Sequence, residues 1–144
     1  MFRKYLLLYW FLNPTIKPRK RKRVSAKEKL EYQKYKDQAR ALVIKKIEKY
    51  NRFYNFKYNR LTIRNQVSRW GSCSQLGNLN FNYKIIFLPE KLADYIIVHE
   101  LCHLKEFNHS PRFWALVAQT FPDYLQLRKD LKKIKTPLPG KSVF

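Results

Sequence analysis

Residues 99–109 of the chain read HELCHLKEFNH. On an α-helix, residues four apart lie on one face, about one turn from each other, so the imidazoles of His99 and His103 can hold one metal ion. Glu100 lies beside them and can reach a water on that metal. The pattern H-E-x-x-H is typical of zinc hydrolases, in which the glutamate acts as general base.

The third metal ligand has two candidates. His109 comes six residues after His103, past an expected break in the helix, and can swing back toward the metal. Glu106 comes three residues after His103 and would share its face on a continuing helix. Asn108 favours His109, because asparagine tolerates the left-handed conformation of a tight turn. With either residue, a catalytic zinc has three protein ligands and one position open for water.

Zinc supplies the chemistry that these residue types suit. It lowers the pKa of a bound water to roughly 7, so hydroxide becomes available near neutral pH. Glu100 would take the proton from that zinc-bound water and later deliver it to the leaving amine. The sequence therefore predicts one zinc ion per chain, with Glu100 as the catalytic residue.

A chance match is the alternative interpretation of a five-residue motif. The chain has three histidines, and all of them fall within residues 99–109. The positions around them are strongly apolar, so the polar groups of this helix are expected to be buried, where they need partners. These features favour a metal site. The related metzincin signature is excluded, because Glu106 replaces its glycine and the only methionine is Met1.

The composition is that of one folded domain with an unusual charge. The chain has 144 residues, 45% of them hydrophobic, and a net charge of +21. Residues 1–60 hold 19 basic and 4 acidic side chains, so the N-terminal half is the more basic. Such a field attracts polyanions, of which nucleic acid is the commonest, although a solvated basic face is the alternative. Cys73 and Cys102 form no disulfide framework and indicate a reducing cytoplasm.

The chain is expected to have three regions. Residues 1–24 are an apolar segment and a basic linker, followed by a domain over residues 25–135 and a tail over residues 136–144. The apolar run near the N-terminus has eight residues, whereas a membrane-spanning helix needs about 20. It also lacks a small-residue cleavage site, so neither a transmembrane segment nor a signal peptide is expected.

The pattern of apolar residues and turn signals predicts an α+β domain. Ser25 and Glu28 form a capping box before a long helix that should end near Tyr50. Period-two alternation predicts a strand at Arg60–Arg64, within a segment, 58–88, that is expected to be sheet. The other predicted elements are a hairpin of residues 69–74 and 79–82, a short apolar segment over 85–88, the metal-binding helix opened by Pro89-Glu90, a helix opened by Ser110-Pro111, and a last amphipathic helix over 124–134.

Five separated motifs occur in order between Ser68 and Leu131. They are RWGSCS at 69–74, GNLNFN at 77–82, LPEKLADYIIVHELCHL at 88–104, NHSPRFW at 108–114 and FPDY at 121–124. Together they resemble the YgjP-like metallopeptidase family, which is related to SprT-type zinc peptidases. The resemblance implies a zincin-like α+β fold, in which a small antiparallel or mixed sheet packs on the HExxH helix and further helices surround it.

The same resemblance implies roles for individual residues. It implies that His99, His103 and His109 hold zinc and that Glu100 is the catalytic base. It also suggests that Arg69–Ser74 is an edge strand along the cleft, which could pair with an extended peptide substrate. The implied substrate-binding residues are Arg69, Trp70, Gly71, Ser72 and Cys73. The alternative is an ordinary sheet strand with Trp70 in the core.

The sequence therefore predicts a zinc-dependent metallopeptidase that acts on peptides or proteins. One alternative is a nucleic-acid-associated module, with proteolysis aimed at nucleic-acid-bound proteins or with no proteolysis. A second is a metal-dependent nucleotide hydrolase, which the positive charge favours and the lack of a glycine-rich phosphate loop disfavours. Arg69, Tyr95 and Arg112 are candidates for stabilising the transition state, and each can equally be structural.

Overall fold

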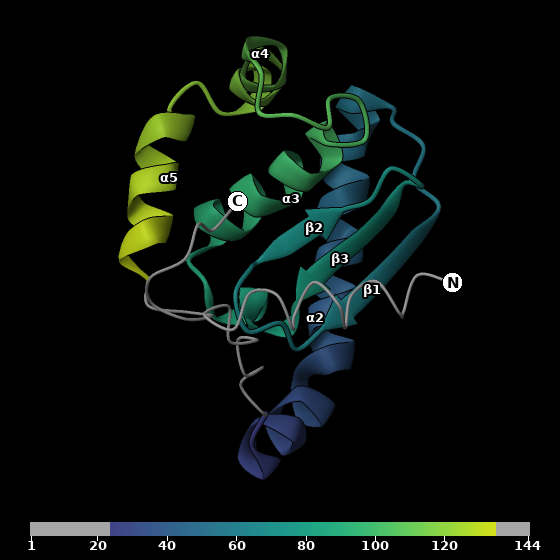
Figure 1. Cartoon of the computed structure of the whole chain (residues 1–144), viewed down its shortest axis with the longest axis vertical. Helices are drawn as coiled ribbons and strands as arrows, with labels where there is room; N and C mark the ends of the chain where they lie inside the picture. Colours follow the sequence, from purple (N-terminus) through teal and green to yellow (C-terminus); the bar gives the residue numbers. More distant parts are fainter. Residues whose placement is uncertain (1–23, 135–144) are drawn as a thin grey trace, which may run out of the picture.

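The structure is a computed structural model of the chain, and it describes residues 24–134 (Figure 1). The predicted N-terminal segment up to residue 23 and the predicted tail lie outside the described residues. The elements are a long helix, three strands, a short 3-10 helix and three further helices. In chain order they are α2 (Ala26–Tyr54), β1 (Arg60–Arg64), β2 (Gly71–Cys73), β3 (Asn78–Asn82), η1 (Tyr83–Phe87), α3 (Glu90–Cys102), α4 (Pro111–Thr120) and α5 (Tyr124–Lys133).

Helix α2 begins at the predicted capping box. The Ser25 hydroxyl accepts a hydrogen bond from the Glu28 amide at 3.1 Å, and the Glu28 carboxylate accepts one from the Ser25 amide at 2.8 Å. The helix does not end near Tyr50 as predicted but continues to Tyr54. No glycine or proline interrupts it there, and Asn55 ends it in the left-handed conformation with φ 52°.

The three strands form one mixed sheet in the order β1-β3-β2. Strand β1 runs parallel to β3, whereas β2 pairs antiparallel with β3 as the predicted hairpin. The hairpin turn contains Gly77 at φ 72°, a conformation that favours glycine. Strand β2 is therefore an edge of the sheet, as the family resemblance suggested.

The sequence prediction was wrong at the end of the segment 58–88. Residues Tyr83–Phe87 are the 3-10 helix η1 instead of sheet. The Asn82 side chain begins this helix by accepting a hydrogen bond from the Lys84 amide at 3.2 Å. A short apolar run fits a buried strand and a buried helical turn equally well, so periodicity could not separate the two.

Helix α3 is the centre of the hydrophobic core. It contacts α2, β2, α4 and α5, and Figure 1 shows it between the sheet and α5. Every residue from Leu92 to Cys102 is buried, which explains why the helix is apolar on all sides rather than amphipathic. Helices α4 and α5 begin near the predicted positions, with Ser110 as the N-cap of α4. Within residues 24–134, no helix is both long and apolar enough to cross a membrane.

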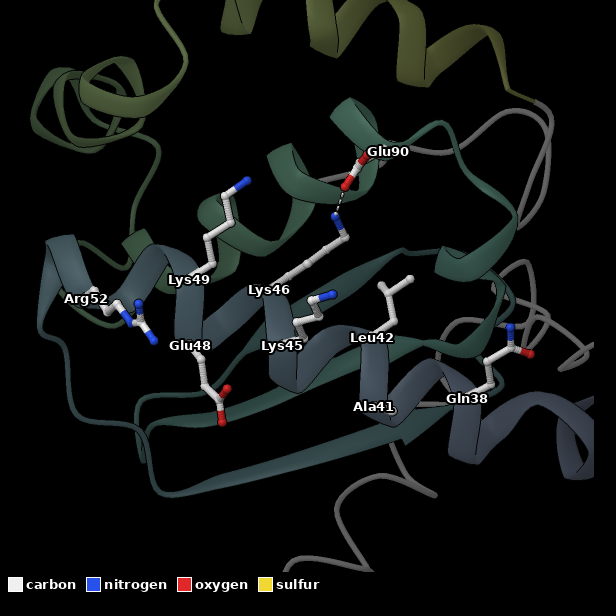
Figure 2. A pocket seen from close by; sticks show the side chains of 9 residues that line it. All are labelled: Gln38, Ala41, Leu42, Lys45, Lys46, Glu48, Lys49, Arg52 and Glu90. Atoms are coloured by element: carbon white, nitrogen blue, oxygen red, sulfur yellow. Dashed lines mark hydrogen bonds and ion pairs between the residues drawn. The ribbon is translucent and has the colours of Figure 1, made fainter.

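A buried ion pair joins α2 to α3. The Lys46 ammonium pairs with the Asp94 carboxylate and, at 3.1 Å, with Glu90, the contact drawn in Figure 2. The Tyr50 hydroxyl donates to the second Asp94 oxygen at 2.7 Å. Burial opposes the charged form of Lys46, but hydrogen bonds to Asp94 and Glu90 outweigh it and raise the pKa of Lys46. The pair lies beside a groove of about 730 Å³ between the two helices.

We expect Asp94→Ala to lower the free energy of unfolding by about 3 kcal/mol, because it leaves a buried ammonium without its main partner. Glu90→Ala is the matched control: its side chain is 82% exposed, against 9% for Asp94, and an exposed pair contributes less than about 1 kcal/mol. Urea unfolding measures both. Equal losses in the two variants would contradict a special role for the buried pair.

Candidate metal centre

Three histidine nitrogens form a nearly equilateral triangle. The Nε2 atom of His103 lies 3.2 Å from that of His99 and 3.1 Å from that of His109, and the remaining side is 3.1 Å. His99 comes from the last turn of α3, His103 is the C-cap residue of that helix, and His109 lies just before α4. The structure therefore brings together the three histidines that the sequence singled out.

The triangle fits a tetrahedral metal ion. Metal–nitrogen bonds of 2.0–2.1 Å in tetrahedral geometry place their nitrogens about 3.3 Å apart, close to the distances found. Burial is the largest cause that lowers the pKa of each of the three imidazoles, and neighbouring positive charges lower the pKa further. The rings are thus neutral near pH 7, with lone pairs available for a cation. Within residues 24–134, these three form the group of ligand atoms that could hold a metal.

Glu106, the alternative third ligand, contacts His103 through its backbone. Helix α3 ends at Cys102, so Glu106 does not share a helical face with His103, as it would on a continuing helix. Its backbone carbonyl lies 3.0 Å from Nδ1 of His103. A hydrogen bond there places the ring proton on Nδ1 and leaves Nε2 free to bind a metal.

Two aromatic rings of α4 pack against the histidines. Phe113 stacks on His103, with ring centres 4.4 Å apart and planes at 26°. Trp114 stacks on His109 at 5.5 Å and 19°. Nothing in the sequence indicated that these two rings pack against the candidate ligands. Their packing restricts ring rotation and holds the triangle in place.

Glu100 lies under the edge strand β2. Its side chain is 1% exposed, and burial raises its pKa to about 8, although the positive charge of Arg69 opposes the rise. A Cβ atom built on Gly71 would lie 2.7 Å from Cγ and Oε1 of Glu100. Only glycine therefore lets β2 pass directly over this carboxyl group.

The other predicted substrate-binding residues take different positions around β2. Trp70 is fully buried in the core, which agrees with the alternative interpretation of this segment as an ordinary sheet strand. The Ser72 hydroxyl accepts a hydrogen bond from the Asn80 amide at 3.3 Å. Cys73 is half-buried, and burial, followed by the charge of Glu100, raises its pKa to about 11. Arg69 lies near enough to Glu100 to lower its pKa.

The two remaining candidates for stabilising the transition state, Tyr95 and Arg112, differ in their burial. Tyr95 is buried one helical turn before His99, with ring centres 5.9 Å apart, whereas Arg112 is exposed on α4. A residue that the sequence did not single out, Arg128 of α5, lies over the Trp114 ring at 4.5 Å. It belongs to no motif, and only the packing of α5 brings it here. Both cysteines are free thiols.

The sequence model of a protein family described as YgjP-like, metallopeptidase domain, matches residues 13–134. That range covers all of the described elements and the candidate metal centre. The chain belongs to the YgjP-like metallopeptidase family. Its membership confirms the family resemblance drawn from the five motifs. Among curated relatives, the chain is 42% identical over 50 residues to the UTP pyrophosphatase of Escherichia coli K12; the match covers 35% of this chain and 30% of that enzyme.

Two solved structures share the fold of this YgjP-like domain. The zymogen of abylysin from Pyrococcus abyssi matches with a TM-score of 0.59 at 23% identity, over 69% of this chain and 99% of that chain. The zymogen of jannalysin from Methanocaldococcus jannaschii matches with a TM-score of 0.53 at 24% identity, over 64% and 97%. Both are zymogens of metallopeptidases, and their structural likeness to this chain confirms the predicted α+β fold.

Elemental analysis of the purified protein tests the ligand set. We expect about one metal ion per chain, lost in His109→Ala because one corner of the triangle disappears. Glu106→Ala should keep the metal, because the backbone carbonyl of residue 106, not its side chain, faces His103. Metal lost only in Glu106→Ala would show that the third ligand is the Glu106 carboxylate and not His109.

Proposed function

We propose that this protein is a zinc-dependent metallopeptidase, with His99, His103 and His109 as the zinc ligands and Glu100 as general base. The triangle of Nε2 atoms, with sides of 3.1–3.2 Å, is the observation that carries the proposal. Three neutral imidazoles leave a bound zinc its full positive charge and an open fourth position. Membership of a metallopeptidase family supports the same conclusion.

Glu100 performs the proton transfers in this proposal. Zinc, when bound, polarises the scissile carbonyl and lowers the pKa of water. The Glu100 carboxylate accepts the proton of the attacking water and passes it to the leaving amine. Its burial under Gly71 keeps the group in one place, which favours a reaction that depends on orientation.

Strand β2 offers a way to bind an extended peptide. It is an edge of the sheet, and its Gly71 end lies directly over Glu100. A substrate strand added along β2 would hydrogen-bond to its backbone and pass beside the catalytic carboxylate. Recognition through backbone groups suits a peptide better than a small molecule without them.

Hydrolysis of a nucleotide is the second candidate activity. The match with a UTP pyrophosphatase supports it, as does the net charge of +21, which attracts phosphates. The same zinc site could polarise a phosphoryl oxygen. The match spans less than a third of that enzyme, so peptide hydrolysis remains the preferred activity.

Substrate panels with Glu100→Gln distinguish the two activities. We expect the zinc-loaded wild type to cleave unstructured peptides, and Glu100→Gln to lose at least about 100-fold in kcat, because the general base is gone. Elemental analysis should find the zinc content unchanged, since Glu100 is not a ligand in this proposal. Cleavage of UTP without cleavage of peptides would contradict the peptidase proposal and favour nucleotide hydrolysis. Full activity of Glu100→Gln would remove this residue from the mechanism.

We also propose that nucleic acid binds along α2. The groove between α2 and α3 is lined by Lys45, Lys49 and Arg52, besides the paired Lys46 and the carboxylates of Glu48 and Glu90 (Figure 2). Lys49 lies 4.0 Å from Asp94, but its side chain is 64% exposed and its charge faces solvent. Along a helix axis, residues 45, 49 and 52 rise by about 6 Å and about 4.5 Å in turn, so they present a row of cations to a phosphate backbone. The basic run at residues 19–23 precedes this helix in the sequence.

Salt dependence tests the nucleic-acid proposal. For single-stranded DNA, the logarithm of the binding constant should fall linearly with the logarithm of the salt concentration, with a slope of about −0.7 per phosphate contact. The triple variant Lys45→Gln, Lys49→Gln, Arg52→Gln should reduce that slope by about 2. The same change at Lys129, Lys132 and Lys133 of α5 removes equal charge elsewhere and serves as control. Salt-independent binding, or equal effects of both triples, would contradict this interface.

A further inference from the structure

Arg128 places a positive charge next to the candidate metal centre. Its guanidinium carbon lies 4.5 Å from the ring centre of Trp114. Trp114 in turn stacks on His109 at 5.5 Å and lies 5.9 Å from His99. The charge of Arg128 also contributes to the lowered pKa values of His99 and His109, after the larger effect of burial. One tryptophan ring therefore bridges the guanidinium and two candidate zinc ligands.

This guanidinium lacks an anionic partner among residues 24–134. The Nε atom is buried and has no hydrogen-bond acceptor, and none of the ion pairs of this part of the chain includes Arg128. The two carboxylates nearest in sequence are committed elsewhere: Asp123 pairs with Lys91 at 2.6 Å, and Asp130 with Lys133 at 2.8 Å.

An unpaired arginine at this position needs an explanation. A buried donor without an acceptor is unfavourable, and a cation over an aromatic ring at a partly exposed site offsets only part of that cost. Arginine cannot lose its charge, and that charge repels a metal cation at the neighbouring histidines. An anionic group in contact with the guanidinium would supply the missing acceptor and offset both charges.

We propose that Arg128 binds an anionic oxygen group of the substrate at the metal centre. The planar fork of a guanidinium matches the two oxygens of a carboxylate or phosphate. A peptide with a free C-terminal carboxylate and a nucleotide with its phosphates both supply such a group. The inference rests on the proposed hydrolytic site and adds a substrate class to it: molecules with an anionic group near the scissile bond.

Inorganic phosphate is the first probe, because its binding needs no turnover. Titration calorimetry of the zinc-loaded protein should find phosphate binding at least about 10-fold weaker in Arg128→Gln, the loss expected for one hydrogen bond between charged groups. Arg128→Lys keeps the charge without the fork and should lose less than Arg128→Gln. Lys129→Gln removes one exposed charge from the same helix and should bind phosphate like the wild type.

The zinc affinity of each variant separates ligand binding from a structural role. Competition with a chelator should find that Arg128→Gln binds zinc at least as tightly as the wild type, since Arg128 is not a ligand and its charge opposes a cation at the histidines. Loss of zinc together with loss of phosphate binding would overturn the proposal and assign Arg128 to holding the histidines. Phosphate affinity equal to that of the wild type would overturn it as well.

Three larger ligands identify the source of the anion, each added to a Glu100→Gln background that does not turn them over. They are a tetrapeptide with a free C-terminus, its C-terminal amide, and UTP. Weaker binding of the free acid alone in Arg128→Gln would assign the group to a peptide carboxylate, and weaker binding of UTP alone would assign it to a phosphate. Equal weakening of the acid and the amide would contradict recognition of an anion. These binding outcomes hold even if neither substrate is hydrolysed, so failure of the proposed activity is distinguishable.

Discussion

The structure depends on keeping three imidazole nitrogens within 3.1–3.2 Å of one another. His99 is fully buried and His103 half-buried, and polar atoms removed from water need partners. The surrounding elements supply the constraint. Helix α3 fixes His99 in the core, the turn after Cys102 aims His103 through the Glu106 carbonyl, and α4 stacks two aromatic rings on the site. A cation at the centre would complete the arrangement.

The sheet contacts the candidate site through strand β2. Strand β2 passes so close to α3 that a side chain at Gly71 would collide with Glu100. The contact shields the carboxyl from water, and burial raises its pKa to about 8. A bound metal cation nearby would favour the ionised form and oppose that rise. The same strand is a sheet edge, so one short segment both covers Glu100, the proposed general base, and offers backbone for a partner strand.

Much of the fold was predictable because its signals are local. The capping box at Ser25 and Glu28, the alternation in β1 and the hairpin of β2 and β3 each depend on neighbours in the chain, and each appeared as predicted. The failures lie where local signals are ambiguous. The apolar run at 85–88 fits a strand and a helical turn equally, and the end of α2 depends on Asn55 adopting a left-handed conformation.

The sequence by itself determined the family, through its five motifs, and the candidate metal site, through the spacing of three histidines and one glutamate. Helical periodicity places His99 and His103 together, so that pair needs no tertiary information. Only the tertiary structure decided between His109 and Glu106 at the third corner, because the choice depends on where α3 ends. Only it brought Gly71 over Glu100 and Arg128 beside Trp114. Those contacts join residues 14 to 29 positions apart in the chain, and no periodicity encodes packing between separate elements.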